Sequence, residues 1–420
     1  MRFLILLFLS ASFFSLNATN VDSLNSIASR SVLTKKSLLI DGKPVNLNVE
    51  TGYLDWKDEY NDVKAKMFYV SYIKEGDNSM DRPITFAFNG GPGSSSLWLH
   101  LGCLGAKRIL MDEIGNAPAP PYTLVDNDWS WLDLTDIVFI DPVGTGFSRP
   151  VKGEKDQQFY GYKNDIGSVG EFIRLFLNKN KRWGSPKYIV GESYGTTRAA
   201  GLSKYLIDKH AIYLNGVVLI SAALNFETLR EQEDNDLSFV NYLPAYTATA
   251  FYHKKLSSGL QVDLKSTLTK VESFIKRDYV EALFLGNTIT PRYKDSIAMV
   301  ISSFTGLTKD YVLKSNLRIP SWRFRKALIG DSSASVGRFD SRLIIDETDK
   351  VDDDCANDAS FTKIRAAFST CINQYIRTEL KYDNDLPYNV IASVSPWEYA
   401  NGKYLNVMPD LADAMVQNPD

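Results

Sequence analysis

The stretch YIVGESYGTTRAAGLSKYL, residues 188–206, constrains the fold most, because it joins an apolar strand to a helix through one tight turn. Ser193 stands at the apex of this turn, between Gly191 and Gly195, in a G-x-S-x-G pattern. Flanking glycines allow the strand and the helix to approach closely around a strained backbone. The stretch therefore predicts a nucleophilic serine. The alternative is a serine that only caps the helix.

Short apolar runs alternate with helical segments around this turn. Fully buried strands are expected at 83–88, 136–141, 187–191 and 216–221, with helices at 163–180 and 196–210. Such alternation predicts an α/β fold with a mainly parallel sheet covered on both faces. Residues 35–75 precede it as an expected antiparallel lead-in, with turns at Asp41-Gly42 and Thr51-Gly52.

The chain divides into four expected segments. Residues 1–18 have one basic residue and then an apolar run shorter than the roughly 20 residues of a spanning helix, which is typical of a cleaved signal peptide. An α/β core is expected over 19–224, a mostly helical cap over 225–402, and a helix returning to the core over 403–420. The mature protein should be exported, periplasmic or extracellular, with no stable membrane association.

Composition narrows the possible partners. The formal net charge is −3 without long runs of one sign, which gives no reason to expect a nucleic-acid partner. No Cys/His cluster has metal-ligand spacing, so neither a metal nor another cofactor is expected. Cys355 and Cys371 are a candidate disulfide in an exported protein, which would leave Cys103 alone, and the unpaired state is equally open. The oligomeric state is undetermined by the sequence.

A glycine-rich loop follows the first of the core strands. The run FAFNGGPGSSSLWLHLG, residues 86–102, has three glycines in four residues and then leads into a helical stretch. Such a loop exposes backbone N–H groups, as an acyl-transfer site requires for its oxyanion. The expected donors are the amides of Gly91 and Tyr194. A plain tight turn is the alternative, and a phosphate-binding loop is disfavoured because no Gly-Lys-Ser/Thr follows. A second loop, Gly144 to Ser148, leaves another core strand and could line the pocket.

Three motifs together carry a family resemblance. NGGPGSSS, DPVGTGFS and GESYG, in this order between residues 80 and 225, resemble the serine carboxypeptidase family of α/β hydrolases. Two later stretches, YTATAFYHKKL at 246–256 and ELKYDNDLPYNV at 379–390, resemble its exported bacterial members. The resemblance implies a hydrolase that removes C-terminal residues of peptides or proteins through an acyl-enzyme. It implies Ser193 as nucleophile, Gly91 and Tyr194 as oxyanion donors, and Asn89 with Glu192 as ligands of the substrate's terminal carboxylate.

The carboxylate-binding role predicts an acid preference. Asn89 can donate hydrogen bonds to a carboxylate, whereas Glu192 can donate only when protonated. Binding should therefore be best under mildly acidic conditions. Familiar members of the family carry a second glutamate a turn beyond the glycine loop, and this chain has Cys103 there.

The proton acceptor for the serine is not evident. In α/β hydrolases the acid and the histidine follow the serine in the chain, on loops after later strands. The three histidines are His100, His210 and His253, and none is assigned as the base. The sequence thus predicts that the triad acid and histidine are absent from this chain. Residues Asp410, Asp413 and Asp420 are poor candidates for the acid, since the resemblance places them before the relevant strand.

Two explanations of the missing base are open. The resemblance implies a truncated chain whose last core strands are missing, or a product that is used without hydrolysis. An esterase or acyltransferase on the same serine, and a non-catalytic peptide-binding protein, are the alternative functions. Turnover of peptides with a free and with an amidated C-terminus would distinguish an esterase from an exopeptidase. Affinity for free-carboxylate peptides that Ser193→Ala leaves unchanged would favour a non-catalytic peptide-binding protein.

Overall fold

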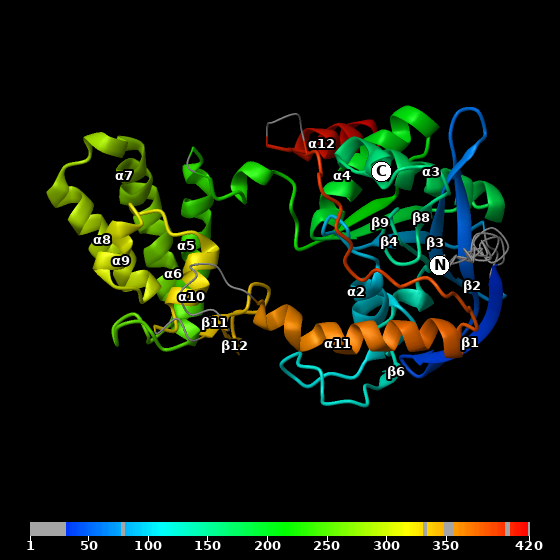
Figure 1. The fold of residues 1–420 in the computed structure, drawn as a ribbon, viewed down its shortest axis with the longest axis horizontal. Coiled ribbons are helices and arrows are strands. Elements are labelled where there is room, and N and C mark those ends of the chain that lie inside the picture. Colours follow the sequence, from blue (N-terminus) through cyan, green and yellow to red (C-terminus); the bar gives the residue numbers. More distant parts are fainter. Residues whose placement is uncertain are drawn as a thin grey trace, which may run out of the picture.

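A mixed β-sheet forms the centre of the protein (Figure 1). The computed structural model describes residues 31–76, 80–232, 234–330, 334–347, 357–399 and 404–418, so the expected signal peptide and Cys355 lie outside the described residues. The strands run in the order β1-β2-β3-β7-β4-β9-β10, and β8 pairs with β3. Their bounds are β1 Val32–Ile40, β2 Lys43–Lys57, β3 Val63–Lys74, β4 Ile84–Phe88, β7 Asp136–Ile140, β8 Arg149–Pro150, β9 Lys187–Glu192 and β10 Gly216–Ile220.

The central strands confirm the predicted fold class. β7, β4, β9 and β10 pair in parallel, while β1, β2 and β3 form the antiparallel lead-in. Both faces of the parallel strands are buried, because neighbouring residues of β9 enter different cores: Ile189 packs towards α3 (Tyr162–Asn180) and α4 (Tyr194–His210), and Val190 packs towards α2 (Leu97–Leu99) and α11 (Ala359–Gln374). Near-continuous apolar strands are what such two-sided burial requires.

Two sequence expectations for the strands are wrong. The turn at Thr51-Gly52 does not exist, because β2 runs through it and Thr51 pairs with Val32 on one side and Val70 on the other. The chain turns instead at Asp58–Asp62. The second error concerns β10, which is only partly buried rather than fully buried, because it pairs with β9 alone and forms an edge of the described sheet.

A separate helical unit lies beside the sheet and has its own apolar core (Figure 1). This unit comprises α5 Asp236–Tyr252, α6 Leu264–Phe274, α7 Val280–Leu285, α8 Pro291–Thr305, α9 Lys309–Lys314 and α10 Ser321–Ala327, with the short strands β11 Ala334–Val336 and β12 Ile344–Asp346. The expected domain boundaries stay a prediction. Within the expected cap, however, α11 contributes Phe368 and Ile372 to the core around the sheet.

Smaller elements complete the fold. The pair β5 Lys107–Ile109 and β6 Leu124–Asp126 flanks the sheet, and α12 Met408–Gln417 packs on α4. Asp410 of α12 accepts a hydrogen bond of 3.0 Å from the hydroxyl of Tyr162. In the part of the chain that the structure describes, no helix is both long enough and apolar enough to cross a membrane.

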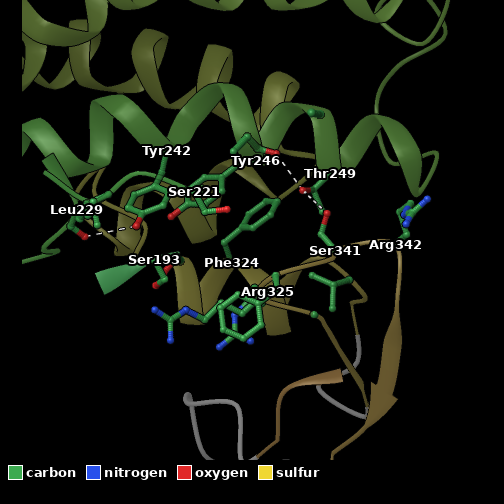
Figure 2. Close-up of a pocket in the computed structure, with 18 of the residues that line it drawn as sticks. Ser193, Ser221, Leu229, Tyr242, Tyr246, Thr249, Phe324, Arg325, Ser341 and Arg342 are labelled. Atoms are coloured by element: carbon green, nitrogen blue, oxygen red, sulfur yellow. Dashed lines mark hydrogen bonds between the residues drawn. The ribbon is translucent and has the colours of Figure 1, made fainter. Parts of the chain in front are cut away.

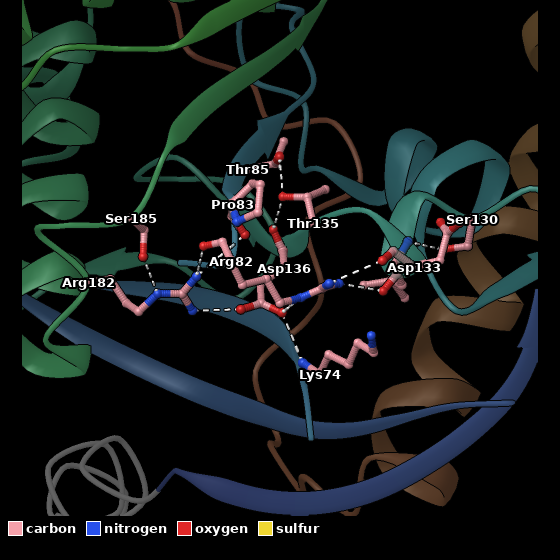
Figure 3. A network of polar contacts seen from close by, with 11 residues as sticks. Lys74, Arg82, Pro83, Thr85, Ser130, Asp133, Thr135, Asp136, Arg182 and Ser185 are labelled. Atoms are coloured by element: carbon pink, nitrogen blue, oxygen red, sulfur yellow. Dashed lines mark hydrogen bonds and ion pairs between the residues drawn. The ribbon is translucent and has the colours of Figure 1, made fainter. Parts of the chain in front are cut away.

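A buried ionic network fixes the N-terminal ends of the parallel strands (Figure 3). Asp136, at the start of β7, accepts hydrogen bonds from Arg82 Nε at 2.8 Å, from Arg182 Nη1 at 2.6 Å and from the amide of Lys74 at 2.9 Å. Arg182 also donates to the carbonyl oxygen of Arg82 at 2.7 Å. One carboxylate therefore joins the starts of β7 and β4, the end of β3 and the loop before β9.

We expect Asp136→Asn to destabilise the protein by about 3–5 kcal/mol, because it removes the carboxylate charge that two buried guanidinium groups contact. The measurement is the midpoint of urea unfolding. Asp55→Asn is the matched control, since Asp55 pairs with Lys66 at 2.9 Å while its side chain is 42% exposed. Such a half-exposed pair should contribute less than about 1 kcal/mol. Equal shifts in the two variants would contradict the central role of Asp136.

Candidate active site

Ser193 lies at the apex of the turn between β9 and α4. Its backbone has φ 56° and ψ −125°, a region that non-glycine residues rarely adopt. Two hydrogen bonds hold this conformation: the Ser193 amide donates to the carbonyl of Ile220 at 2.9 Å, and the amide of Thr196 donates to the Ser193 carbonyl at 2.9 Å. The strain is therefore balanced by the parallel neighbour β10 and by the first turn of α4.

The flanking glycines are required by close backbone contacts. A Cβ atom on Gly191 would lie 2.1 Å from the carbonyl oxygen of Gly195, and one on Gly195 would lie 2.8 Å from the carbonyl oxygen of Phe88. Both contacts are to backbone atoms, which cannot move aside as a side chain can. The turn can therefore form only around these two glycines, as the G-x-S-x-G pattern predicts.

The glycine-rich loop after β4 packs directly on this turn. A Cβ atom on Gly90 would lie 2.4 Å from the amide nitrogen of Tyr194 and 2.7 Å from that of Gly195. Gly91 has φ 103°, a conformation that side-chain-bearing residues rarely adopt. The loop thus sits against the first N–H groups of α4, which carry partial positive charge at a helix N-terminus.

A cavity of about 1380 Å³ opens at this point (Figure 2). Gly91, Ser193 and Tyr194 all line the cavity, together with Ser221 to Ala223 after β10 and residues of the helical unit. The structure thus brings the predicted nucleophile and both predicted oxyanion donors to one cavity. Their catalytic roles stay predictions.

Asn89 and Glu192 are also brought together, but outside the lining of the cavity. Asn89 Nδ2 donates to Glu192 Oε2 at 2.9 Å, and Asn89 Oδ1 accepts from the amide of Leu99 at 3.0 Å. Asn89 is fully buried, and neither residue is among those that line the cavity. Burial raises the pKa of Glu192, although the hydrogen bonds from Asn89 and from the Gly90 amide lower it. Their role as carboxylate ligands stays a prediction.

The buried side chain of Arg198 contacts the backbone of Asn89. Its side chain is 1% exposed, forms an ion pair of 2.8 Å with Asp165, and donates to the carbonyl of Asn89 at 2.7 Å. The guanidinium group also lies over the ring of Tyr194, 5.4 Å from its centroid. One cation of α4 therefore fixes the backbone of Asn89 and the residue that follows the serine.

None of the histidines contacts Ser193. His100 is buried, its Nε2 lies 2.6 Å from the hydroxyl of Tyr72, and burial lowers its pKa to about 3. His210 ends α4, so it lies about 25 Å from the serine along the helix at 1.5 Å per residue. His253 Nε2 lies 2.6 Å from the carbonyl oxygen of Ser341 in the helical unit.

The environment of His210 differs from the simple expectation for a helix end. A cation is favoured near the C-terminus of a helix. Burial nevertheless lowers the pKa of His210, because its nearest carboxylate oxygen, on Glu171, is 3.8 Å from Nε2 and compensates only in part.

The loop from Gly144 to Ser148 does not line the large cavity, and that expectation is wrong. The loop is held in the core, because Ser148 Oγ donates to the carbonyl of Asp141 at 2.6 Å and accepts from the amide of Phe68 at 2.7 Å. The Asp141 carboxylate accepts from the Ser96 amide at 2.8 Å, and burial raises the pKa of Asp141 to about 7. This carboxyl group was not among the predicted site residues, and it faces a small void of about 10 Å³ beside His100.

Comparison with known proteins agrees with the motifs. A family model described as serine carboxypeptidase matches residues 40–296. The chain is similar to serine carboxypeptidase-like 10 of Arabidopsis thaliana, with 31% identity over 41% of this chain and 39% of that protein. It is also similar to serine-type carboxypeptidase F of Aspergillus niger, with 30% identity over 36% and 26%, and to the lysosomal protective protein of Mus musculus, with 25% identity over 51% and 40%. The chain thus spans less than half the length of these relatives.

Solved structures that match this chain have lower sequence identity to it. A peroxisomal alpha-beta-hydrolase from Saccharomyces cerevisiae matches 50% of this chain and 57% of its own, with 12% identity and a TM-score of 0.26. A carboxyl esterase from Bacillus coagulans matches 51% and 54%, with 15% identity and a TM-score of 0.27. The fold assignment rests on the sheet order and on the turn at Ser193.

We expect Gly90→Ala to disrupt the site, because the added methyl group would meet the backbone nitrogen of Tyr194 at 2.4 Å. Overpacking of this kind typically costs about 1–3 kcal/mol, and here no flexible side chain can relieve it. Gly259→Ala is the matched control, since no atom lies within 4 Å of its added Cβ. Urea unfolding midpoints of both variants test the expectation, and a neutral Gly90→Ala variant would contradict the close contact.

Proposed function

Because the chain belongs to the serine carboxypeptidase family, we propose that Ser193 forms an acyl-enzyme with the C-terminal peptide bond of a peptide substrate. Ser193 Oγ would attack the carbonyl carbon and lose its proton, the C-terminal residue would leave as an amine, and water would then hydrolyse the ester. The observation that supports this most is that a strained serine and the amides of Gly91 and Tyr194 border one cavity. Amides placed there would stabilise the oxyanion of the tetrahedral intermediate.

We also propose that Asn89 and Glu192 select a free terminal carboxylate. Their mutual hydrogen bond supports a joint role, and the raised pKa of Glu192 supplies a proton donor over a wider pH range than an ordinary glutamate. A protonated Glu192 donates to the substrate carboxylate, whereas an ionised one repels it. Binding should therefore be strong below the raised pKa of Glu192 and weaken as the pH rises through it.

The expected pH dependence can be measured with a peptide that has a free C-terminus and with its C-terminal amide. Calorimetric affinity for the free acid should fall as the pH rises, while affinity for the amide should change little. Glu192→Gln keeps a hydrogen-bond donor at all pH values, so it should remove most of this dependence. If the two peptides bind equally well at every pH, Asn89 and Glu192 have no such role.

Among the described residues, no base contacts Ser193, and the three histidines lie elsewhere. Loss of a triad member commonly leaves an enzyme about 10³–10⁴ times faster than water, through the oxyanion hole and binding alone. We therefore propose that the 420-residue chain is acylated slowly by itself and that an external base accelerates the reaction.

Imidazole tests this proposal directly. We expect a fluorophosphonate to label Ser193 slowly in a buffer without imidazole and faster in proportion to added neutral imidazole, as measured by intact mass. Ser193→Ala should show no imidazole-dependent label, which controls for other nucleophiles. Rapid stoichiometric labelling without imidazole would show that the chain already contains the base.

An esterase or acyltransferase is the second candidate. The position of Asn89 and Glu192 outside the cavity lining favours it, because an ester substrate needs no carboxylate ligand. Equal turnover of free and amidated peptides would support this alternative over the exopeptidase.

We also infer that the protein is exported. Residues 1–18, with one basic residue and then a short apolar run, support this inference.

A further inference from the structure

The cavity extends from Ser193 far into the helical unit (Figure 2). Its volume of about 1380 Å³ exceeds the 300–1,000 Å³ that is usual for a small-molecule site. Tyr242 and Tyr246 of α5 and Phe324 of α10 form one wall, with Tyr246 and Phe324 stacked at a centroid distance of 4.1 Å. The hydroxyl of Tyr246 is engaged by Glu231 and by the carbonyl of Ile319, so this wall offers mainly apolar ring faces.

Among the residues that the structure describes, the charged side chains of the cavity wall all have the same sign. None of the described residues that line the cavity is Asp or Glu, while the following five are cationic: Arg230, Lys254, Arg325, Arg338 and Arg342. Arg342 forms an ion pair with Asp340 at 2.6 Å. The other four have no carboxylate partner in the part of the chain that the structure describes. A cleft lined by one sign of charge concentrates ligands of the opposite sign.

Arg325 carries the least compensated of these charges. Its Nη1 atom is buried and has no hydrogen-bond partner among the described residues. Figure 2 shows its side chain in the same cavity as Ser193. Arg338 and Lys254 lie instead over aromatic rings, 5.4 Å from the centroid of Phe339 and 5.5 Å from that of Phe251. No carboxylate of the described residues neutralises the charge of Arg325, which lines the cavity, and a guanidinium group forms strong charge-assisted contacts with a ligand carboxylate.

The position of the cavity relative to Ser193 indicates which part of a peptide substrate enters it. Under the proposed function, on which this inference rests, the leaving C-terminal residue is held by Asn89 and Glu192. Neither of them lines the cavity, whereas Gly91, Ser193 and Tyr194 border it. The acyl part, N-terminal to the scissile bond, is therefore the part that enters the cavity.

We propose that the cavity selects acidic peptides, with Asp or Glu on the N-terminal side of the scissile bond. Arg325 binds the acidic side chain nearest to the serine, and Arg338 binds one farther into the helical unit. The aromatic wall of α5 and α10 contacts the apolar parts of the same chain.

Four peptides test this inference and keep it separate from the proposed function. They are acetyl-Asp-Ala-Asp-Ala-Phe and acetyl-Asn-Ala-Asn-Ala-Phe, each as the free acid and as the C-terminal amide. Calorimetric affinities are measured on the Ser193→Ala chain to prevent turnover. At low salt we expect the Asp peptides to bind about fivefold tighter than the Asn peptides, and this ratio should decline at 0.5 M salt because exposed charges are then screened.

Variants that remove one charge each show which arginines cause the preference for Asp over Asn peptides. Arg325→Gln and Arg338→Gln should each reduce the Asp-over-Asn ratio by about twofold or more. Arg292→Gln is the matched control, because Arg292 is an exposed arginine of α8 that does not line the cavity. Circular dichroism spectra of the three variants establish that they are folded.

The outcomes are distinct. Equal binding of the Asp and Asn peptides, or no binding of either, overturns the inference. The inference is also overturned if Arg292→Gln reduces the Asp-over-Asn ratio as much as the two cavity variants do, because the effect would then come only from the net charge of the protein. The comparison of free acids with amides tests the carboxylate ligands separately. An amide that binds as well as its acid would count against the proposed exopeptidase while leaving a preference for Asp measurable.

Discussion

The contact between the glycine loop and the start of α4 is the constraint on which the site depends. Gly90 lies against the amides of Tyr194 and Gly195 so closely that no side chain fits between them. This contact holds the end of β4 and the end of β9 together, although the two segments are about a hundred residues apart in sequence. The strained backbone of Ser193 is tolerated because both neighbouring segments are fixed in this way.

Much of the core was predictable from the sequence because its signals are local. Apolar runs located β4, β7 and β9, and the glycine spacing located the turn at Ser193. The errors arose where the tertiary surroundings decide. Thr51-Gly52 resembles a turn, yet both sides of that segment are paired with other strands, so the chain stays extended. The apolar run of β10 indicated full burial, but burial also requires a neighbour on each side.

The large cavity shows the limit of such reasoning most clearly. The family motifs indicated Gly91, Ser193 and Tyr194, but nothing in the sequence around Arg325 or Arg338 indicates a shared wall. These residues come from α10 and from the segment after β11, and only the packing of the helical unit brings them to the serine's cavity. His100 is one of the three histidines that the sequence offers as a base, but the structure shows that it is a core residue. Its Nε2 lies 2.6 Å from the hydroxyl of Tyr72, and its ring stacks on that of Phe139 with 4.3 Å between the centroids.

Helix α11 belongs to both halves of the protein, as Figure 1 shows. At its start, Ser360 Oγ accepts a hydrogen bond from the amide of Phe339 in the helical unit at 3.0 Å. Farther along, the ring of Phe368 packs at a tilt against that of Trp98, with 4.7 Å between the ring centroids. An outward movement of the helical unit would have to bend α11 or expose its buried aromatic side chains. Exposure costs a free energy of about 1.5–3 kcal/mol for each large side chain. We therefore expect α11 to limit changes in the width of the cleft, so that a ligand has to fit the opening with little help from domain movement.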